Sequence, residues 1–115
     1  MGYYTNYNLI VKHMNGTQEY QDLVQMLKAK GILGYALDEY YDSAYDCEFS
    51  SADTVKWYEY NEDMTDISIH FPDMVFCLEG WGEDSTDIWR AYYKNGKAEY
   101  CPAQIIFPEP EKIEW

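Results

Sequence analysis

The sequence predicts one small α+β domain, residues 1–115, in which two helices pack on one face of a mainly antiparallel sheet of four to five strands. Three observations lead to this fold class. The chain has 115 residues, 47% of them hydrophobic, which allows one core and leaves little room for a second. Strand-like alternation and helix-like periodicity occupy separate stretches of the chain. The clearest pattern of all is that of a β-hairpin near the carboxyl end.

The first predicted element is a strand over residues 3–11. Its apolar side chains Tyr7, Leu9 and Val11 alternate with polar ones, as they do in a strand that faces a core on one side. The polar positions on the other face are Asn6, Asn8 and Lys12.

The next segment predicts an amphipathic helix after a turn at Asn15-Gly16. Thr17 is a candidate N-cap, and Glu19 lies in the first turn, where a negative charge favours the helix dipole. Gly31 stands where a glycine commonly follows the last helical turn. Apolar side chains recur between these ends at intervals of three and four residues, namely Tyr20, Leu23, Val24 and Leu27.

Residues 32–53 show no single period, because Gly34, serines and many acids interrupt them. We expect an irregular segment here, which could contain one short helix or strand. Residues 54–60 are rich in β-branched and aromatic side chains, which predicts a strand with Val55 and Trp57 facing one way.

A second helix is expected to begin at Asn61 as its N-cap, with Glu62 and Asp63 in the first turn. Pro72 ends it, because the residue before a proline is disfavoured in the α conformation. The inner face of this helix would carry Met64, Ile67, Ser68 and Phe71.

Three strands complete the predicted fold. Residues 74–79 form the first of them, and residues 80–86 form a loop. Residues 87–94 and 97–107 form a hairpin closed by Asn95-Gly96, a dipeptide that supplies the positive φ values of a type I′ turn.

The net charge is the most informative number for function. Eight Lys and Arg residues stand against 21 Asp and Glu residues, which gives a net charge of −13. Solubility of a small domain needs a magnitude of only about 2–8, so the excess calls for another reason. Binding to DNA, RNA or anionic lipid is disfavoured, because neutralising phosphates takes a basic surface. The sequence therefore predicts a cationic partner.

Catalytic and metal-binding motifs are missing from the sequence. His13 and His70 lie far from one another along the chain, and no P-loop, GxSxG, HExxH or GxGxxG motif occurs. Glu83, Asp84 and Asp87 offer carboxylates of the kind that calcium prefers, but without EF-hand spacing, so a solvated acidic loop is the better reading. We therefore expect no enzyme activity, no cofactor and no bound metal.

The cysteines and the amino terminus bear on location. Cys47, Cys77 and Cys101 are odd in number and lack a CxxC spacing, which favours free thiols and a reducing cytoplasm. Residues 1–8 have neither a basic n-region nor an apolar h-region, so no secretory signal is expected.

The acidic segment 38–53 is the first candidate for binding, since it holds six acids and no Lys or Arg. In a helix, Asp38, Asp42 and Asp46 would stack about 6 Å apart. In a strand, Asp46 and Glu48 would share a face, about 6.6 Å apart. Either geometry sets negative charges at a separation like that of successive phosphates; the alternative is a solvated acidic surface. The predicted partner-binding residues are Asp38, Glu39, Tyr41, Asp42, Asp46, Glu48, Asp53, Glu83, Asp84 and Asp87.

Residues 56–97 resemble a group of small acidic proteins of bacteriophages and other mobile elements, most of which have no assigned activity. Such genes often encode inhibitors of host defence, and anti-CRISPR and anti-restriction proteins are among the possible members. The resemblance provides no binding residue to transfer. It rests on Lys56-Trp57-Tyr58, Glu62-Asp63-Met64, Phe71-Pro72, Phe76, Leu78, Gly80-x-Gly82-Glu83, Asp87-Ile88-Trp89, Tyr92 and Asn95-Gly96-Lys97.

Together, charge and resemblance predict a non-enzymatic inhibitor in the cytoplasm of a bacterial host. Its acidic surface would mimic a nucleic acid and block the cationic nucleic-acid channel of a CRISPR effector or restriction nuclease. Two alternatives remain. One is an immunity protein that neutralises a basic toxin, and the other is a phage accessory or assembly protein.

Overall fold

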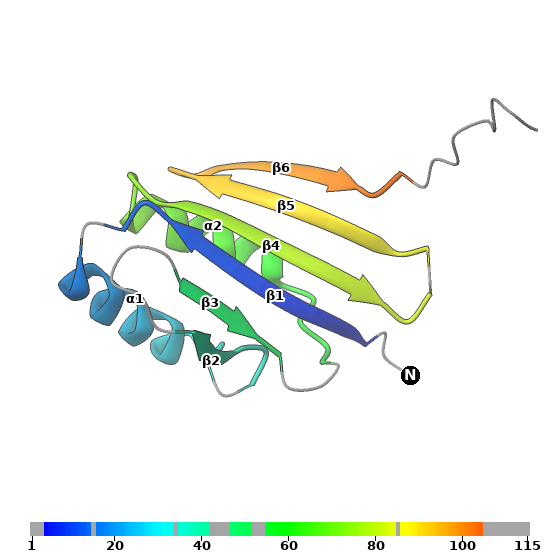
Figure 1. Cartoon of the computed structure of the whole chain (residues 1–115), viewed down its shortest axis with the longest axis horizontal. Helices are drawn as coiled ribbons and strands as arrows, with labels where there is room; N and C mark the ends of the chain where they lie inside the picture. The colour runs from blue at the N-terminus through cyan, green and yellow to red at the C-terminus, as the bar shows by residue number, and fades with distance from the viewer. Residues whose placement is uncertain are drawn as a thin grey trace, which may run out of the picture.

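The computed structural model describes residues 4–14, 16–33, 35–41, 47–51, 55–84 and 86–104, with the backbone alone at 38–41 and 47. Its six strands form one antiparallel sheet in the order β2-β3-β1-β4-β5-β6 (Figure 1). This arrangement confirms the predicted α+β class. The elements follow one another as β1 (Thr5–Lys12), α1 (Thr17–Ala29), β2 (Asp38–Tyr41), β3 (Cys47–Ser50), α2 (Tyr60–His70), β4 (Val75–Gly82), β5 (Ile88–Lys94) and β6 (Lys97–Pro102).

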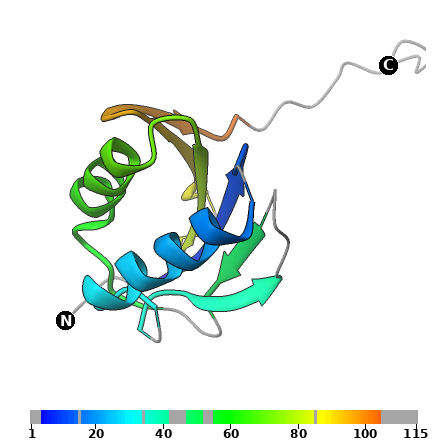
Figure 2. The ribbon, with the colours of Figure 1, turned by 90° about the vertical axis from the view of Figure 1, so that its left-hand side faces the viewer.

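Both helices cover the same face of the curved sheet, and the core lies between them and that face (Figure 2). Alternation along the strands selects the core side chains. In β1, Tyr7, Leu9 and Val11 are buried, as predicted, and in β5 Trp89 and Tyr93 are buried. Within the described residues, neither helix has the length and apolar character that crossing a membrane requires.

Helix α1 has the predicted inner face, since Tyr20, Leu23 and Leu27 are buried. Its end is also as predicted, because Gly31 takes a φ of 73°, the left-handed conformation that glycine adopts most easily after a helix. The predicted cap is wrong. Gly16 occupies the N-cap position, Thr17 is the first helical residue, and no side chain caps the start of the helix.

The segment that appeared irregular in sequence contributes two strands rather than a single short piece. β3 pairs with β1, and β2 pairs with β3 at the edge of the sheet. Phe49 of β3 is fully buried and stacks on Tyr20 of α1 at a ring distance of 6.4 Å. Pairing with an existing strand thus decides the structure here, where sequence periodicity is weak.

The strand predicted over 54–60 is wrong. Within its described part, Val55 forms an isolated bridge with Thr5, and Tyr58 and Glu59 lie in a turn. Helix α2 begins at Tyr60, with Glu59 as an N-cap that makes no side-chain capping bond. Aromatic side chains made this segment resemble a strand, but Trp57 is buried by packing on the core and not by sheet pairing.

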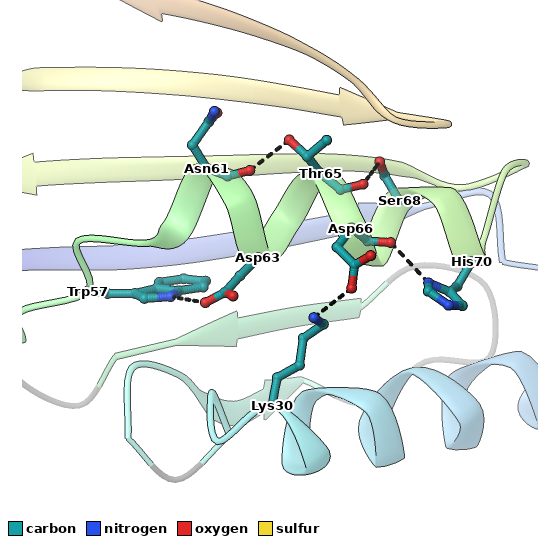
Figure 3. Close-up of polar contacts among 8 residues, drawn as sticks. All are labelled: Lys30, Trp57, Asn61, Asp63, Thr65, Asp66, Ser68 and His70. Atoms are coloured by element: carbon teal, nitrogen blue, oxygen red, sulfur yellow. Dashed lines mark hydrogen bonds and ion pairs between the residues drawn. The ribbon is translucent and has the colours of Figure 1, made fainter.

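Asn61 does not cap α2, because it lies inside the helix. Its backbone carbonyl accepts a hydrogen bond from the Thr65 hydroxyl at 2.6 Å, shown in Figure 3, and its side-chain oxygen accepts one from the Tyr93 hydroxyl at 3.0 Å. The predicted inner face is confirmed, since the buried residues of this helix and its end are Met64, Ile67, Ser68 and Phe71.

The last three strands follow the prediction with two changes. β6 ends at Pro102, because residues 103 and 104 are not in a strand, and residues 105–107 of the predicted strand lie outside the described residues. β4 continues to Gly82, so Gly80 and Gly82 belong to the strand and not to the expected loop. The hairpin of β5 and β6 is confirmed, and Asn95 and Gly96 have φ values of 47° and 81°, as a type I′ turn requires.

Candidate binding site

Strand β2 places Asp38, Glu39 and Tyr41 at one edge of the sheet, where their side chains lie outside the described residues. The helical alternative for this segment is wrong at Asp38, because the backbone there is a strand. Glu48 lies on β3, opposite Ile10, and is partly exposed. The predicted residues Asp42, Asp46 and Asp53 lie outside the described residues.

The loop between β4 and β5 holds the other predicted acids in a compact turn. Glu83 is exposed, and its carboxylate accepts a hydrogen bond from the backbone N–H of Tyr4 at 2.5 Å. The Asp84 carboxylate accepts hydrogen bonds from the backbone N–H and hydroxyl of Thr86, at 2.9 and 2.8 Å, which lower the pKa of Asp84. The backbone N–H of Asp87 donates to the Asp84 carbonyl at 2.9 Å. These bonds fix the position of Asp87, the residue directly before β5.

Asp87 lines a pocket of about 250 Å³ whose other walls are mostly aromatic. The pocket gathers residues from β1, the turn before α2, the start of α2, β5 and β6. Tyr58 and Tyr100 are its exposed members, with 65% and 56% of their surface accessible. The lining residues are Thr5, Tyr7, Trp57, Tyr58, Tyr60, Asp87, Trp89 and Tyr100.

The rings of this aromatic pocket pack on one another in defined geometries. Tyr60 stacks on Trp89 with ring centroids 4.7 Å apart, and Tyr100 lies 5.7 Å from Trp89. Tyr7 meets Trp57 edge-to-face at 5.2 Å. Aromatic pairs in such arrangements contribute about 0.5–1.5 kcal/mol beyond the area that they bury. The pocket wall is therefore held in place before any ligand arrives.

Polar bonds fix the inner rings further. The Tyr7 hydroxyl donates a hydrogen bond to the backbone carbonyl of Trp57 at 3.2 Å. The indole Nε1 of Trp57 donates to the carboxylate of Asp63 at 2.8 Å, as Figure 3 shows. One side of the pocket is thereby tied to helix α2, since Asp63 belongs to its first turn.

Charge near the pocket comes from carboxylates. Burial raises the pKa of Tyr7 to about 12, and the nearby Asp87 carboxylate acts in the same direction. Burial also raises the pKa of Tyr60, with Tyr100 and Asp87 adding to the effect. Both phenols are therefore neutral at physiological pH, while Asp87 brings a negative charge to an aromatic wall.

A larger hollow, of about 390 Å³, lies on the opposite face of the sheet, because its lining residues of β4 and β5 include Glu79, Trp81, Ile88 and Arg90, which alternate with the core residues. Its charged members are Glu79 and Arg90, which pair with each other at 2.7 Å. Asn8 donates a further hydrogen bond to Glu79 at 3.1 Å. Because these charges neutralise each other, we expect this hollow to attract a cationic ligand less strongly than the aromatic pocket does.

Charge is unevenly distributed between the two sides of the sheet. By strand alternation, the face opposite the helices carries the cations Lys12, Arg90, Lys94 and Lys97 and the acids Glu48, Glu79 and Glu99. The other described cations are Lys28, Lys30 and Lys56. The remaining acids whose side chains are described are Glu19, Asp22, Glu59, Glu62, Asp63, Asp66, Asp73, Glu83, Asp84 and Asp87.

Sequence reasoning found Asp87 but missed the aromatic pocket and the acids of α2. Tyr58, Trp57 and Trp89 appeared only as strand-like or core residues. The helical spacing of Glu59, Glu62 and Asp66 was a readable signal, because residues three and four apart share a helix face.

No known family model, curated protein or solved structure matches this chain. Among the described residues, no group of three or more His, Cys, Asp or Glu side chains is placed to hold a metal ion.

Proposed function

We propose that this domain is a non-enzymatic inhibitor that binds a cationic protein surface, and that its target is the nucleic-acid channel of a host-defence nuclease. The observation that supports the proposal best is the net charge of −13 on a folded scaffold. Repulsion among so many like charges destabilises the folded state. We therefore infer that the excess negative charge serves a function.

The distribution of the described charges supports a binding surface on the helix side. The face opposite the helices is nearly balanced, whereas the other acids whose side chains are described greatly outnumber the cations Lys28, Lys30 and Lys56. Glu59 is the N-cap residue of α2, Glu62 and Asp66 lie on the helix, and Asp73 follows its end. Lys30 pairs with Asp66 at 2.6 Å, as Figure 3 shows, which links α1 to the acidic face of α2.

Binding would proceed through electrostatic attraction followed by close contact. Complementary charge speeds encounter and weakens as salt is added, since exposed charges are screened over about 8–10 Å at physiological ionic strength. Carboxylates on a fixed backbone would then occupy the positions of phosphates. Displacement of guide or target nucleic acid is the proposed mechanism, and it involves no bond breaking.

The nature of the target follows from the resemblance of residues 56–97 to acidic proteins of mobile elements. A CRISPR effector or a restriction nuclease in the cytoplasm of the bacterial host is the partner that this resemblance favours. An immunity protein against a basic toxin would use the same charge. The two functions differ in outcome, because one protects foreign DNA and the other protects a cell from a toxin.

The proposal can be tested by nuclease inhibition. DNA cleavage by a panel of purified CRISPR effectors and restriction nucleases would be measured with increasing amounts of the protein, at 50 and 300 mM salt. We expect inhibition of at least one nuclease that weakens at the higher salt. Reversal of Glu59, Glu62 and Asp73 together, three exposed acids at α2 and just after it, should abolish this inhibition in a variant that keeps its circular-dichroism spectrum. Full inhibition by that variant, or rescue from a basic toxin with no nuclease inhibited, would contradict the proposal.

A further inference from the structure

We propose that the aromatic pocket beside Asp87 binds one arginine side chain of the cationic partner. This inference rests on the proposed function, because it names the group that the acidic surface recognises at one point. It adds an anchor of defined shape to a charge attraction that is otherwise diffuse. Anchors of this kind contribute most of the binding energy in protein interfaces, and aromatic residues and arginine are frequent among them.

The size of the pocket fits a single side chain. Its volume of about 250 Å³ is below the range of roughly 300–1,000 Å³ that sites for small molecules usually occupy. Two of its rings, Tyr58 and Tyr100, are more than half exposed, so the pocket is reached from solvent. The inner rings of Tyr7, Trp57 and Trp89 are buried and fixed by their contacts. A side chain could therefore enter between exposed rings and end against an ordered wall.

The chemistry of the wall selects a cation. The faces of Tyr and Trp rings are negative because of their quadrupole, and a cation within about 6 Å of a ring is attracted to it. The carboxylate of Asp87 lines the same pocket and adds a full negative charge. An anionic group would meet repulsion from this carboxylate.

Arginine fits this wall better than lysine does. Its guanidinium is flat and stacks on aromatic faces. It is also more weakly hydrated than an ammonium group, so its transfer from water into the pocket costs less hydration free energy. Its five N–H donors would also allow hydrogen bonds to the Asp87 carboxylate while the plane of the group lies against a ring. An ammonium group offers a point charge without a stacking surface.

The experiment uses small probes and the whole chain, so it needs no partner. N-acetyl-arginine amide would be titrated into the ¹⁵N-labelled protein at constant ionic strength, while the indole N–H signals of Trp57 and Trp89 are followed. N-acetyl-citrulline amide is the matched control, since it has the same shape without the charge. N-acetyl-lysine amide tests the preference for a flat cation. Trp81, on the opposite face of the sheet, serves as an internal reference.

We expect saturable shifts of Trp57 and Trp89 with arginine, a dissociation constant in the millimolar range, and binding at least about fivefold weaker with lysine or citrulline. Equal binding of citrulline, equal binding of lysine, or the absence of a saturable shift would overturn the inference. These comparisons use the unaltered protein, so they do not depend on the folding of a variant.

Two substitutions locate the bound probe. Asp87→Asn and Tyr100→Leu should each weaken arginine binding about fivefold or more. Tyr92→Leu removes an exposed tyrosine from the opposite face of β5 and should leave binding unchanged. Equal loss in all three variants would contradict a site at this pocket. Arginine binding here without any nuclease inhibition would refute the proposed function alone, and inhibition without arginine binding would refute the pocket alone.

Discussion

A Cβ atom added to Gly80 would lie 2.8 Å from Nε1 of Trp89, and two carbons of the same indole would be closer still. The two residues face each other across the β4–β5 pair. Glycine is needed at this point of β4 because another chain atom approaches closely, a common reason for a glycine inside a strand. The position of Trp89, and with it the back wall of the aromatic pocket, therefore depends on a residue that has no side chain.

Gly80→Ala should destabilise the fold by about 1–3 kcal/mol, the usual cost of forcing an extra group into a packed site. The free energy of unfolding in a denaturant titration measures this cost. In a Trp89→Leu background the same change should cost clearly less, because the indole that meets the new methyl group is gone. An equal cost in both backgrounds would show that the close approach of Gly80 and Trp89 has no energetic effect.

Stability should fall at alkaline pH through Tyr7. The folded protein keeps the proton of Tyr7 up to a pKa of about 12, above the ordinary value of 10.0, so the unfolded chain loses this proton first. The stabilisation is complete below pH 10 and is lost as the pH rises toward 12. Tyr7→Phe should show a smaller loss of unfolding free energy between pH 9 and pH 11 than the unaltered protein. An unchanged slope in Tyr7→Phe would contradict the assignment.

The pair of Glu79 and Arg90 should matter more than an exposed ion pair. Glu79 has 8% of its surface accessible, and Arg90 is its cation at 2.7 Å. Arg90→Met leaves this carboxylate without its charge partner, at a cost of about 1–2 kcal/mol, between the values for exposed and buried pairs. Lys97→Met, at an exposed cation of the neighbouring strand, should cost less than about 0.5 kcal/mol. Equal unfolding free energies for the two variants would count against a structural role of the pair.

Periodicity explains which parts of the fold were predictable. Tyr20, Leu23 and Leu27 of α1 and the alternating residues of β1 pack where their spacing indicates, and Asn95-Gly96 forms the expected turn. The structure of these elements is determined largely by residues that are close together in sequence. The structure of β2 and β3 depends instead on strand pairing, of β3 with β1 and of β2 with β3.

The aromatic pocket could not be predicted from the sequence for a related reason. Tyr7, Trp57, Trp89 and Tyr100 are far apart in sequence and meet only because the strand order and register bring them together. Asp87 was identified from its charge, but its aromatic surroundings follow from the position of Gly80 opposite Trp89. The charge of the site could therefore be predicted from local sequence patterns, whereas its shape follows from the topology of the sheet.

The most direct test of the account compares two charge reversals that change the net charge by the same amount. Glu62→Lys alters the acidic face of α2, and Glu99→Lys alters an exposed acid on the opposite face of the sheet. The affinity of each variant for the inhibited nuclease would be measured at one fixed salt concentration. We predict that Glu62→Lys weakens binding at least about tenfold and that Glu99→Lys changes it less than about twofold. Equal weakening by the two variants would mean that only overall charge matters, and the claim of an acidic binding face on the helix side would be wrong.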